Sequence, residues 1–406
     1  MSQHPAVPFS PARAGAAAVL ALALGTLSPA AADVAPRNQP GDAVQKALNE
    51  LVGGGFSGAL AAVRERDGRS RNYTAGVGDL ATRAKVPVNG QVRIASTTKT
   101  FTAAVVLQLA GEGKVELDVP VEKYLPNVVR GNGNDGRLIT VRQLLQHTSG
   151  LPEHGKALAG TFFESQHRYF EPRELVDLAL TQKPLFAPGK GWSYSNTGYV
   201  LLGLLVQKVT GRPIGAETTD RIITPLGLGD TYWPSPGEQR IRGPHPRAYK
   251  SRTGRPGGEP VDVSEMDPSR GWAAGQLVST PRDVNRFLSA LLGGKLLKPA
   301  MLEQMKRTVP VPGAPQGWGY GLGLTKIRLS CSGLAWGHSG DVGGYATRNG
   351  ITEGGRSATV TATEKSVTAE GDKQLDSALD TALCAGKQRG GKPPAGRPGE
   401  GPAVRP

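Results

Sequence analysis

Residues 92 to 109 read Val92-Arg93-Ile94-Ala95-Ser96-Thr97-Thr98-Lys99-Thr100-Phe101-Thr102-Ala103-Ala104-Val105-Val106-Leu107-Gln108-Leu109. The spacing of the apolar residues changes after Ala95 from a strand-like to a helical period. Beyond Lys99 the apolar side chains occur nearly all round a helix, which is typical of a buried one. Gly111 and Gly113 predict where this helix ends. The segment therefore predicts a buried helix that begins close to Ser96.

Ser96 and Lys99 at the start of this helix are candidates for catalysis. A serine hydroxyl is a poor nucleophile and needs a base within hydrogen-bond reach. At this spacing the two side chains share one helix face. Burial would lower the pKa of the lysine, and the helix N-terminus favours negative charge near the serine. Alone the pattern is weak, because a surface serine and lysine at this spacing occur by chance.

The two ends of the chain predict one antiparallel sheet. Residues 41–52 predict a helix, and residues 56–77 predict a hairpin that turns at Asp67-Gly68. Late in the chain come further strand candidates and a last amphipathic helix. The strand candidates are 320–324, 335–336, 345–348 and 357–363, and the helix is 373–383.

The middle of the chain is helical in character. Helices are predicted at 140–146, 171–180 and 198–210, with Pro- and Gly-rich connectors. The fold class is therefore α/β (α+β), with an antiparallel sheet flanked by helices plus an all-helical lobe. The α/β part takes about 41–117 and 270–385, and the lobe takes about 118–269.

Both termini lie outside the predicted folded domain of residues 33–385. Residues 1–32 contain a short apolar run followed by small residues up to Ala32, which predicts a cleaved signal peptide. A membrane anchor is the alternative, but the run is too short to span a bilayer comfortably. Residues 386–406 are rich in Gly, Pro and basic residues, which predicts a disordered tail. We therefore expect a secreted, extracellular protein of the cell wall that does not span the membrane.

The formal net charge of the 406 residues is +14, and the body remains basic without its tail. An anionic wall polymer or a membrane surface is one explanation, and a composition that simply prefers Arg is the other. Nucleic acid is not an expected partner of an exported protein. We expect a monomer.

The only two cysteines are Cys331 and Cys384. In an oxidising compartment an isolated pair usually forms a disulfide. Such a bond would fasten the C-terminal helix to the body. The cysteines are far apart and the histidines show no His-Glu-x-x-His pattern, so no metal or other cofactor is expected.

Two further motifs contain groups that suit catalysis. Tyr194-Ser195-Asn196 lies in a tight loop before an apolar helix. A tyrosine whose pKa is lowered by a nearby lysine can relay protons, and an asparagine amide can hold a substrate amide. The alternative is a loop in which Asn196 merely caps the helix. His338-Ser339-Gly340 predicts a Gly-rich edge strand beside a cleft, or else a turn with an exposed histidine.

Together the three motifs resemble the penicillin-recognising serine hydrolases. The order Ser-x-x-Lys, Tyr-x-Asn, His-Ser-Gly is similar to the branch of class C β-lactamases and secreted actinomycete D-alanyl-D-alanine carboxypeptidases. Residues 140–152 and 272–280 resemble further conserved runs of this family, and the resemblance covers about residues 42–384. His338, the cysteine pair and residues 320–324 resemble the carboxypeptidases more than the β-lactamases.

The resemblance implies a role for each matched residue. Ser96 would be acylated, and Lys99 and Tyr194 would handle the proton. His338 would take the place of the lysine in the Lys-Thr-Gly triplet of many relatives. The implied substrate-binding residues are Asn196, Ser339, Gly340, Asp341 and Trp272. The backbone N–H groups of Ser96 and Asp341 would form the oxyanion hole.

Two departures from the family pattern bear on the substrate. Thr325 stands where those relatives have a basic residue, and Asp341 stands where they commonly have a hydroxyl residue. Asp341 would repel a substrate carboxylate if its side chain pointed inward. The carboxylate would then depend on Ser339 and His338, with Lys326 or Arg348 as further candidates.

The sequence thus predicts a penicillin-sensitive serine D-alanyl-D-alanine carboxypeptidase that acts on peptidoglycan stem peptides. β-Lactams would be its inhibitors or substrates. The alternatives are an esterase, a D-amino-acid amidase or a β-lactamase on the same fold. A non-catalytic wall-binding or antibiotic-sensing protein is a third hypothesis.

Overall fold

The computed structural model describes residues 42–158, 160–253, 258–363 and 368–385. The predicted signal peptide at 1–32 and the predicted tail at 386–406 lie outside the described residues. None of the described helices is long and apolar enough to cross a bilayer.

An antiparallel sheet of eight strands unites the two ends of the described chain. Its order is β2 (Ser70–Gly76), β1 (Gly58–Arg64), β14 (Ser357–Ala362), β13 (Tyr345–Thr352), β11 (Leu334–Gly337), β10 (Thr325–Arg328) and β9 (Gly319–Tyr320), while β12 (Gly340–Val342) pairs with β13. In the register, Ala61 of β1 lies opposite Val360 of β14. The prediction of one antiparallel sheet from both chain ends is confirmed.

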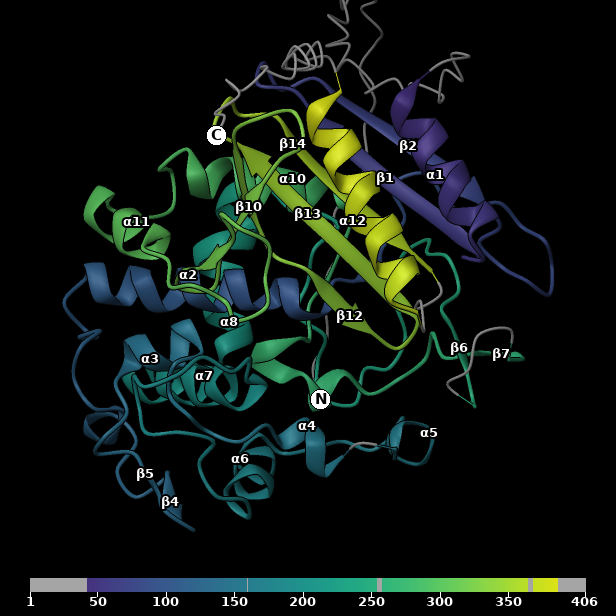
Figure 1. The fold of residues 1–406 in the computed structure, drawn as a ribbon. Coiled ribbons are helices and arrows are strands. Elements are labelled where there is room, and N and C mark those ends of the chain that lie inside the picture. Colours follow the sequence, from purple (N-terminus) through teal and green to yellow (C-terminus); the bar gives the residue numbers. More distant parts are fainter. Residues whose placement is uncertain (1–41, 159, 254–257, 364–367, 386–406) are drawn as a thin grey trace, which may run out of the picture. The chain divides into compact units, whose positions relative to one another are not determined.

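Helices cover both faces of this sheet (Figure 1). On one face α1 (Ala43–Gly53) and α12 (Ala369–Cys384) pack side by side, and on the other lies α10 (Pro281–Leu292). Strand β1 is therefore buried on both sides. Its Ala59, Ala61 and Val63 join the core under α1 and α12, and Leu60 joins the larger core on the α10 side. A strand between two helical layers needs apolar residues on both faces, which the composition of β1 supplies.

The predicted buried helix is α2 (Thr98–Gly111), at the centre of the larger core. It follows β3 (Val92–Arg93), which pairs with β8 (Val278–Ser279), and the 3₁₀ turn η1 (Ala95–Thr97). The ring of Phe101 stacks on Phe287 of α10 with centroids 3.6 Å apart. The helix ends at Gly111, as predicted, and α11 (Pro299–Lys306) packs beside it.

The middle of the chain is mostly helical, as predicted. Its helices are α3 (Val141–Gln146), α4 (His154–Ala157), α5 (Phe162–Ser165), α6 (Pro172–Leu180), α7 (Asn196–Thr210), α8 (Ile214–Thr218) and α9 (Thr224–Leu226). Short helical turns accompany them: η2 (Val121–Lys123) before α3, η3 (Thr219–Ile223) between α8 and α9, and η4 (Pro268–Arg270) and η5 (Trp272–Ala274) after α9. In α3, Thr140 and Gln143 form a reciprocal capping box that fixes the helix start.

Two details of the predicted fold are wrong. The lobe is not all-helical, because β4 (Arg130–Gly131) pairs with β5 (Asn134–Asp135) and β6 (Tyr249–Ser251) with β7 (Pro260–Asp262). These strands are too short to show a period of two. Of the predicted strand at 320–324 only Tyr320 lies in a strand, β9, and residues 321–324 form the turn between β9 and β10. A side chain at Gly321 would meet the carbonyl oxygen of Met305 at 2.1 Å, and Gly323 has a φ of +74°.

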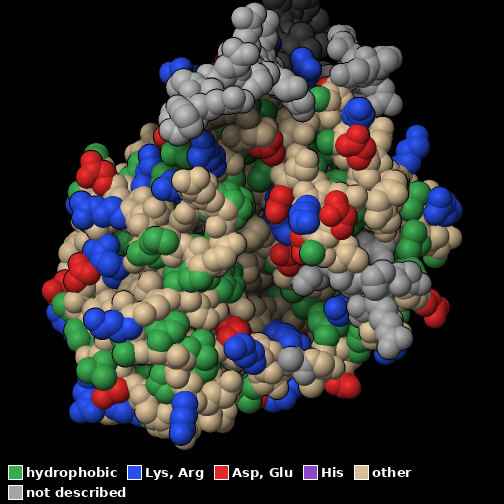
Figure 2. Space-filling model, viewed as in Figure 1, with side chains coloured by type: hydrophobic (Ala, Val, Ile, Leu, Met, Phe, Trp, Pro, Cys, Tyr) green, Lys and Arg blue, Asp and Glu red, His purple; other side chains and the backbone are tan. Residues whose placement is uncertain are grey.

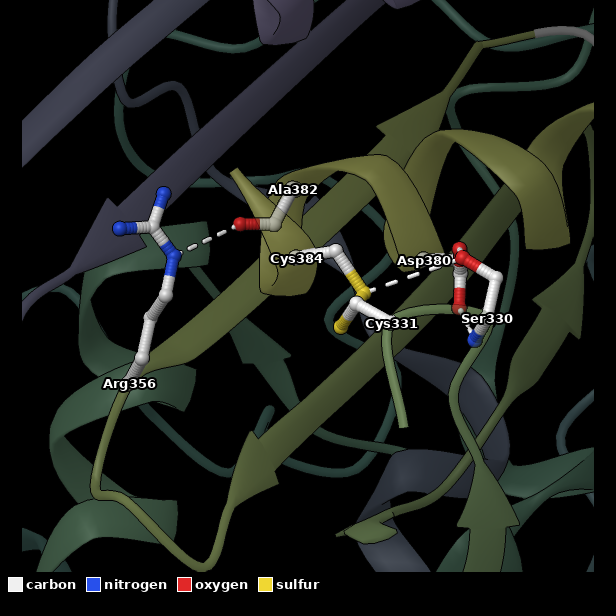
Figure 3. The surroundings of a disulfide bond; sticks show 6 residues. All are labelled: Ser330, Cys331, Arg356, Asp380, Ala382 and Cys384. Atoms are coloured by element: carbon white, nitrogen blue, oxygen red, sulfur yellow. Dashed lines mark hydrogen bonds between the residues drawn. A yellow bond between two sulfur atoms is a disulfide. The ribbon is translucent and has the colours of Figure 1, made fainter. Parts of the chain in front are cut away.

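The predicted disulfide between Cys331 and Cys384 is present, with Cα atoms 5.7 Å apart (Figure 3). It joins the end of α12 to the loop between β10 and β11. Two hydrogen bonds lie beside it: Ser330 N donates to Asp380 Oδ1 at 2.9 Å, and Arg356 Nε donates to the carbonyl of Ala382 at 2.9 Å. The bond thus fastens α12 to the sheet that it covers.

Replacing both cysteines with serine should lower the free energy of unfolding. The bond closes a loop with a sequence separation of 53, worth about 4 kcal/mol in the chain-entropy model. Denaturant titration of the double variant should show this loss, and the parent protein treated with reductant should match it. An unchanged denaturation midpoint in both samples would contradict the prediction.

Candidate active site

Ser96 lies on η1 and Lys99 in the first turn of α2, and the backbone turns sharply just before them. Ala95 has a φ of +45°, an uncommon value for a residue with a side chain. The turn holds Ser96 half-buried and directs the fully buried Lys99 toward it. Lys99 Nζ lies 3.0 Å from Ser96 Oγ. The predicted pair of nucleophile and base is therefore within hydrogen-bond distance.

The amine of Lys99 has two further partners. It donates to Asn196 Oδ1 at 2.6 Å and to the carbonyl of Ala274 at 2.9 Å. Burial lowers the pKa of Lys99 to about 7, and the negative charge of Glu153 opposes this shift. Near neutral pH a large fraction of Lys99 is thus the free amine, which can accept the proton of Ser96.

Tyr194 lies over the same amine, with its ring centroid 4.8 Å from Lys99 Nζ. The prediction that Lys99 lowers its pKa is wrong. Burial raises the pKa of Tyr194 well above its usual value, and a hydrogen bond with Ser96 opposes that rise. The phenol stays protonated at neutral pH because it is desolvated. Tyr194 is therefore suited to donate a proton, whereas Lys99 is suited to accept one.

Asn196 begins α7 but does not cap it. Ser195 is the cap, and its hydroxyl accepts from Gly198 N at 3.4 Å. The amide of Asn196 is left to bridge two charged groups, because its oxygen faces Lys99 and its Nδ2 donates to Glu153 Oε1 at 3.0 Å. The alternative interpretation of Asn196 as a mere cap is excluded.

His338 is buried within the site, and its ring centroid lies 6.3 Å from that of Tyr194. Its Nδ1 lies 2.5 Å from the carbonyl of Ser339, so this nitrogen carries the proton. Its Nε2 then accepts from the hydroxyl of Tyr320 at 2.9 Å. Burial lowers the pKa of His338 to about 3. His338 is thus neutral at physiological pH and does not supply the positive charge of a lysine.

Gly340 brings the edge strand β12 against the nucleophile. A Cβ atom at Gly340 would lie 2.2 Å from the carbonyl of Ile94 and 3.0 Å from Ser96 N, so only glycine fits. Ser339 next to it is exposed. This close approach is consistent with the predicted oxyanion hole of the Ser96 and Asp341 N–H groups, which stays a prediction.

The carboxylate of Asp341 does not point toward Ser96. It forms an ion pair with Arg348 at 3.0 Å, and Arg348 also pairs with Asp376 at 2.8 Å and Asp372 at 3.3 Å. The last two aspartates lie on α12, which covers the other face of the sheet. Asp341 therefore does not repel a substrate directly. Arg348, engaged by three carboxylates, is not available to hold a substrate carboxylate.

Trp272 lies outside the cluster around Ser96, contrary to its predicted role in the cleft. A Cβ atom at Gly203 of α7 would touch its indole ring at 2.6 Å. The ring instead lines a separate cavity of the lobe. Only its neighbour Ala274 reaches the site, through the carbonyl that binds Lys99.

Sequence reasoning missed two residues that shape the site. Glu153, one residue beyond the run 140–152, accepts from the backbone N and the Nδ2 of Asn196. His147, inside that run, accepts from Ser195 N at 3.1 Å, and its ring lies 4.4 Å from that of Tyr194. An acidic residue next to a family motif was the available signal for Glu153. The left-handed backbone of His147, with a φ of +63°, has no signal in the sequence.

The structure therefore brings Ser96, Tyr194, Asn196 and His338 together around the amine of Lys99. This arrangement is suited to acyl transfer through a serine. The face drawn in Figure 1 is hollowed near its centre (Figure 2).

The family model described as Beta-lactamase matches residues 44–383. The chain belongs to this family of penicillin-binding-like serine hydrolases.

The names of similar proteins and of similar solved structures include several different activities. Esterase EstB of Burkholderia gladioli is 31% identical over 56% of this chain and 65% of its own length. Penicillin-binding protein 4 of Amycolatopsis lactamdurans is 28% identical over 68% of this chain and 73% of its own length. The match to penicillin-binding protein 4* of Bacillus subtilis spans only 34% of that protein.

Among solved structures, a D-stereospecific amidohydrolase from Streptomyces sp. superposes with a TM-score of 0.76 at 38% identity, over 84% of this chain and 98% of that one. The D-amino acid amidase of Ochrobactrum anthropi SV3 gives a TM-score of 0.73 at 29% identity, over 84% and 96% of the two chains.

The rate of acylation should rise with pH through about 7. The base is the deprotonated amine of Lys99, and the pKa of that amine is lowered to about 7. His338 should add no step near neutrality, because burial lowers its pKa to about 3. Stopped-flow acylation by an activated ester between about pH 5 and 9 measures this profile.

The variant Lys99→Arg is the control, since a guanidinium keeps its proton throughout this range. It should be inactive at every pH. A profile that is flat in the parent protein, or an active Lys99→Arg variant, would contradict the role of Lys99.

Proposed function

We propose that this chain is a D-stereospecific serine amidohydrolase, which acylates Ser96 with a D-amino acid that has a free α-amino group. The observation that carries the proposal is the carboxylate of Glu153 next to Asn196. It places a negative charge three hydrogen bonds from the nucleophile, by way of Asn196 and Lys99. A substrate ammonium group would find its counter-ion there.

The cations of the site also favour this substrate class. A carboxypeptidase substrate ends in a carboxylate, which needs a positive partner. Arg348 is held by three aspartates, and His338 is neutral. The site thus offers an anion to an amino group more readily than a cation to a carboxylate. The names of the Streptomyces and Ochrobactrum neighbours support the same activity.

The chemistry would follow from the geometry. The free amine of Lys99 takes the proton of Ser96 as Oγ attacks the substrate carbonyl. The N–H groups of Ser96 and Asp341 would stabilise the resulting oxyanion. Tyr194 donates its phenolic proton to the leaving nitrogen, the C–N bond breaks, and the Lys99 proton restores the phenol. Water then attacks the ester, and the free acid leaves Ser96 restored.

A D-alanyl-D-alanine carboxypeptidase is the second candidate. The segment His338-Ser339 that leads into the edge strand β12 favours it, and so does the likeness to penicillin-binding protein 4. Lys326 and Ser339 would then have to hold the terminal carboxylate. Export to the cell wall, as a peptidoglycan enzyme requires, is part of this candidate.

Substrate comparison distinguishes the candidates. The proposed amidohydrolase should release ammonia from D-phenylalanine amide faster than from its L-enantiomer, and faster than it releases D-alanine from a D-Ala-D-Ala peptide. Ammonia and D-alanine assays measure the three rates. Preferred release of D-alanine would favour the carboxypeptidase and overturn the proposal.

The variant Glu153→Gln should raise KM for a free D-amino-acid amide by roughly ten- to hundredfold, the value of a hydrogen bond to a charged group. It should change KM for the N-acetylated amide little, since that substrate has no charge to pair. The exposed Glu303→Gln on α11 is the matched control. An equal effect of Glu153→Gln on both substrates would assign Glu153 a purely structural role.

The variant Ser96→Ala should lose activity by at least roughly a thousandfold while it keeps its fold. A fluorescent penicillin should label the parent protein covalently and leave this variant unlabelled, as seen on a denaturing gel. Labelling that persists in Ser96→Ala would place the nucleophile elsewhere.

A further inference from the structure

A second cavity, of about 630 Å³, lies in the helical lobe between α6, α7, α8 and the segments 233–236 and 272–276. None of Ser96, Lys99, Tyr194 and Asn196 lines it. Its lining residues on α7, Leu204 and Gln207, lie about 12 to 16 Å along the helix from Asn196. Its volume is that of a ligand pocket. It is therefore a separate site from the one that contains the nucleophile.

Two tryptophans form rigid walls of this cavity. A Cβ atom at Gly215 of α8 would lie 2.8 Å from the ring of Trp233, and one at Gly203 of α7 would lie 2.6 Å from the ring of Trp272. Each indole thus packs directly on a glycine backbone, which leaves little room to rotate. Trp233 is half-buried and Trp272 is buried. Fixed aromatic surfaces bind a ligand at a low cost in conformational entropy.

One residue of the cavity lining has a buried polar atom without a partner. Gln276 is 4% exposed, and its Nε2 donates to the carbonyl of Pro234 at 2.8 Å. Its Oε1 is buried and has no hydrogen-bond partner among the described residues. A buried acceptor of this kind is costly to leave unpaired. A ligand with an N–H or O–H group would satisfy it.

The charged residues of the lining are mostly neutralised. Arg173 pairs with Asp177, and Asp220 pairs with Arg212. The remaining charged residue is Glu171, whose carboxylate is also an acceptor. The cavity therefore offers aromatic surfaces and acceptors, and it offers no free cation to an anionic ligand.

We propose that this cavity binds a pyranose ring of a neutral or N-acetylated saccharide. The C–H face of a pyranose is apolar and matches an indole surface, while its hydroxyl or acetamido groups are donors for Gln276 and Glu171. The binding is non-covalent and independent of acylation at Ser96. The chain thus holds a saccharide in the lobe while it processes an acyl substrate on Ser96.

The probe for this proposal is the β-1,4-linked trimer of N-acetylglucosamine, titrated into the full chain. Tryptophan fluorescence and saturation-transfer NMR should both report saturable binding. Trp233→Ala should weaken it by at least about tenfold, and the matched control Trp318→Ala, at a half-buried tryptophan that does not line the cavity, should not. Ser96→Ala should bind the trimer as the parent does.

A second variant, Gln276→Met, removes the acceptor but keeps the volume, and it should also weaken binding. Hydrolytic activity and the thermal midpoint of each variant show that it has folded. Absence of binding up to about 10 mM trimer overturns the proposal. Wild-type affinity for the trimer in folded Trp233→Ala or Gln276→Met also overturns the proposal. Binding of free indole in the cavity by a protein that does not bind the trimer overturns it as well. Loss of trimer binding on penicillin acylation of Ser96 would place the saccharide in the catalytic cleft and also overturn it.

Discussion

The burial of one amine, that of Lys99, governs this structure. A lysine that is fully buried is costly as an ammonium, and the protein offsets part of this cost with three acceptors. These acceptors come from η1, α7 and η5, which are far apart in the sequence. The remaining cost appears as a pKa lowered to about 7, which is the property that general-base catalysis needs. Stability and reactivity are therefore set by the same contacts.

The threonines of α2 and η1 hold these distant segments in place. Thr100 Oγ1 donates to the carbonyl of Gly323 at 2.8 Å, and Thr102 Oγ1 donates to that of Ala273 at 2.7 Å. Asn349 Nδ2 of the sheet donates to Thr97 Oγ1 at 2.9 Å. A helix with apolar residues nearly all round would otherwise pack without a fixed orientation. These hydroxyl groups orient α2, so that Lys99 meets Ala274 and Asn196.

Much of this was predictable from the sequence, because the signals are local. The change of period after Ala95 located the central helix, and glycine at 111 marked its end. The motifs around Ser96, Tyr194 and His338 identified residues that the fold brings together. The cysteine pair predicted its disulfide.

Other features depend on packing that no local pattern encodes. The pKa of Tyr194 rises because burial outweighs its hydrogen bond with Ser96, and the depth of burial is a property of the whole fold. The side chains of Asp341 and Trp272 point away from Ser96 because of strand alternation and a strained turn, where Trp272 has a φ of +36°. Glu153 gains its importance only when Asn196 is brought to it. The ladder of β4 and β5 was not predictable because strands of two residues show no period.

The pairing of β1 with β14 has a consequence for how the chain folds. Ala59 lies opposite Ala362, so these two neighbouring strands of the sheet are separated in sequence by nearly the whole domain. Contacts of such high sequence separation form late, because the entropy of closing the intervening loop must be overcome first. Strand β12, which reaches Ser96, belongs to this late half. The helical lobe, in contrast, is continuous in sequence and can become ordered earlier. A partly synthesised chain would thus contain the lysine and the asparagine of the site before it had a sheet on which to assemble them.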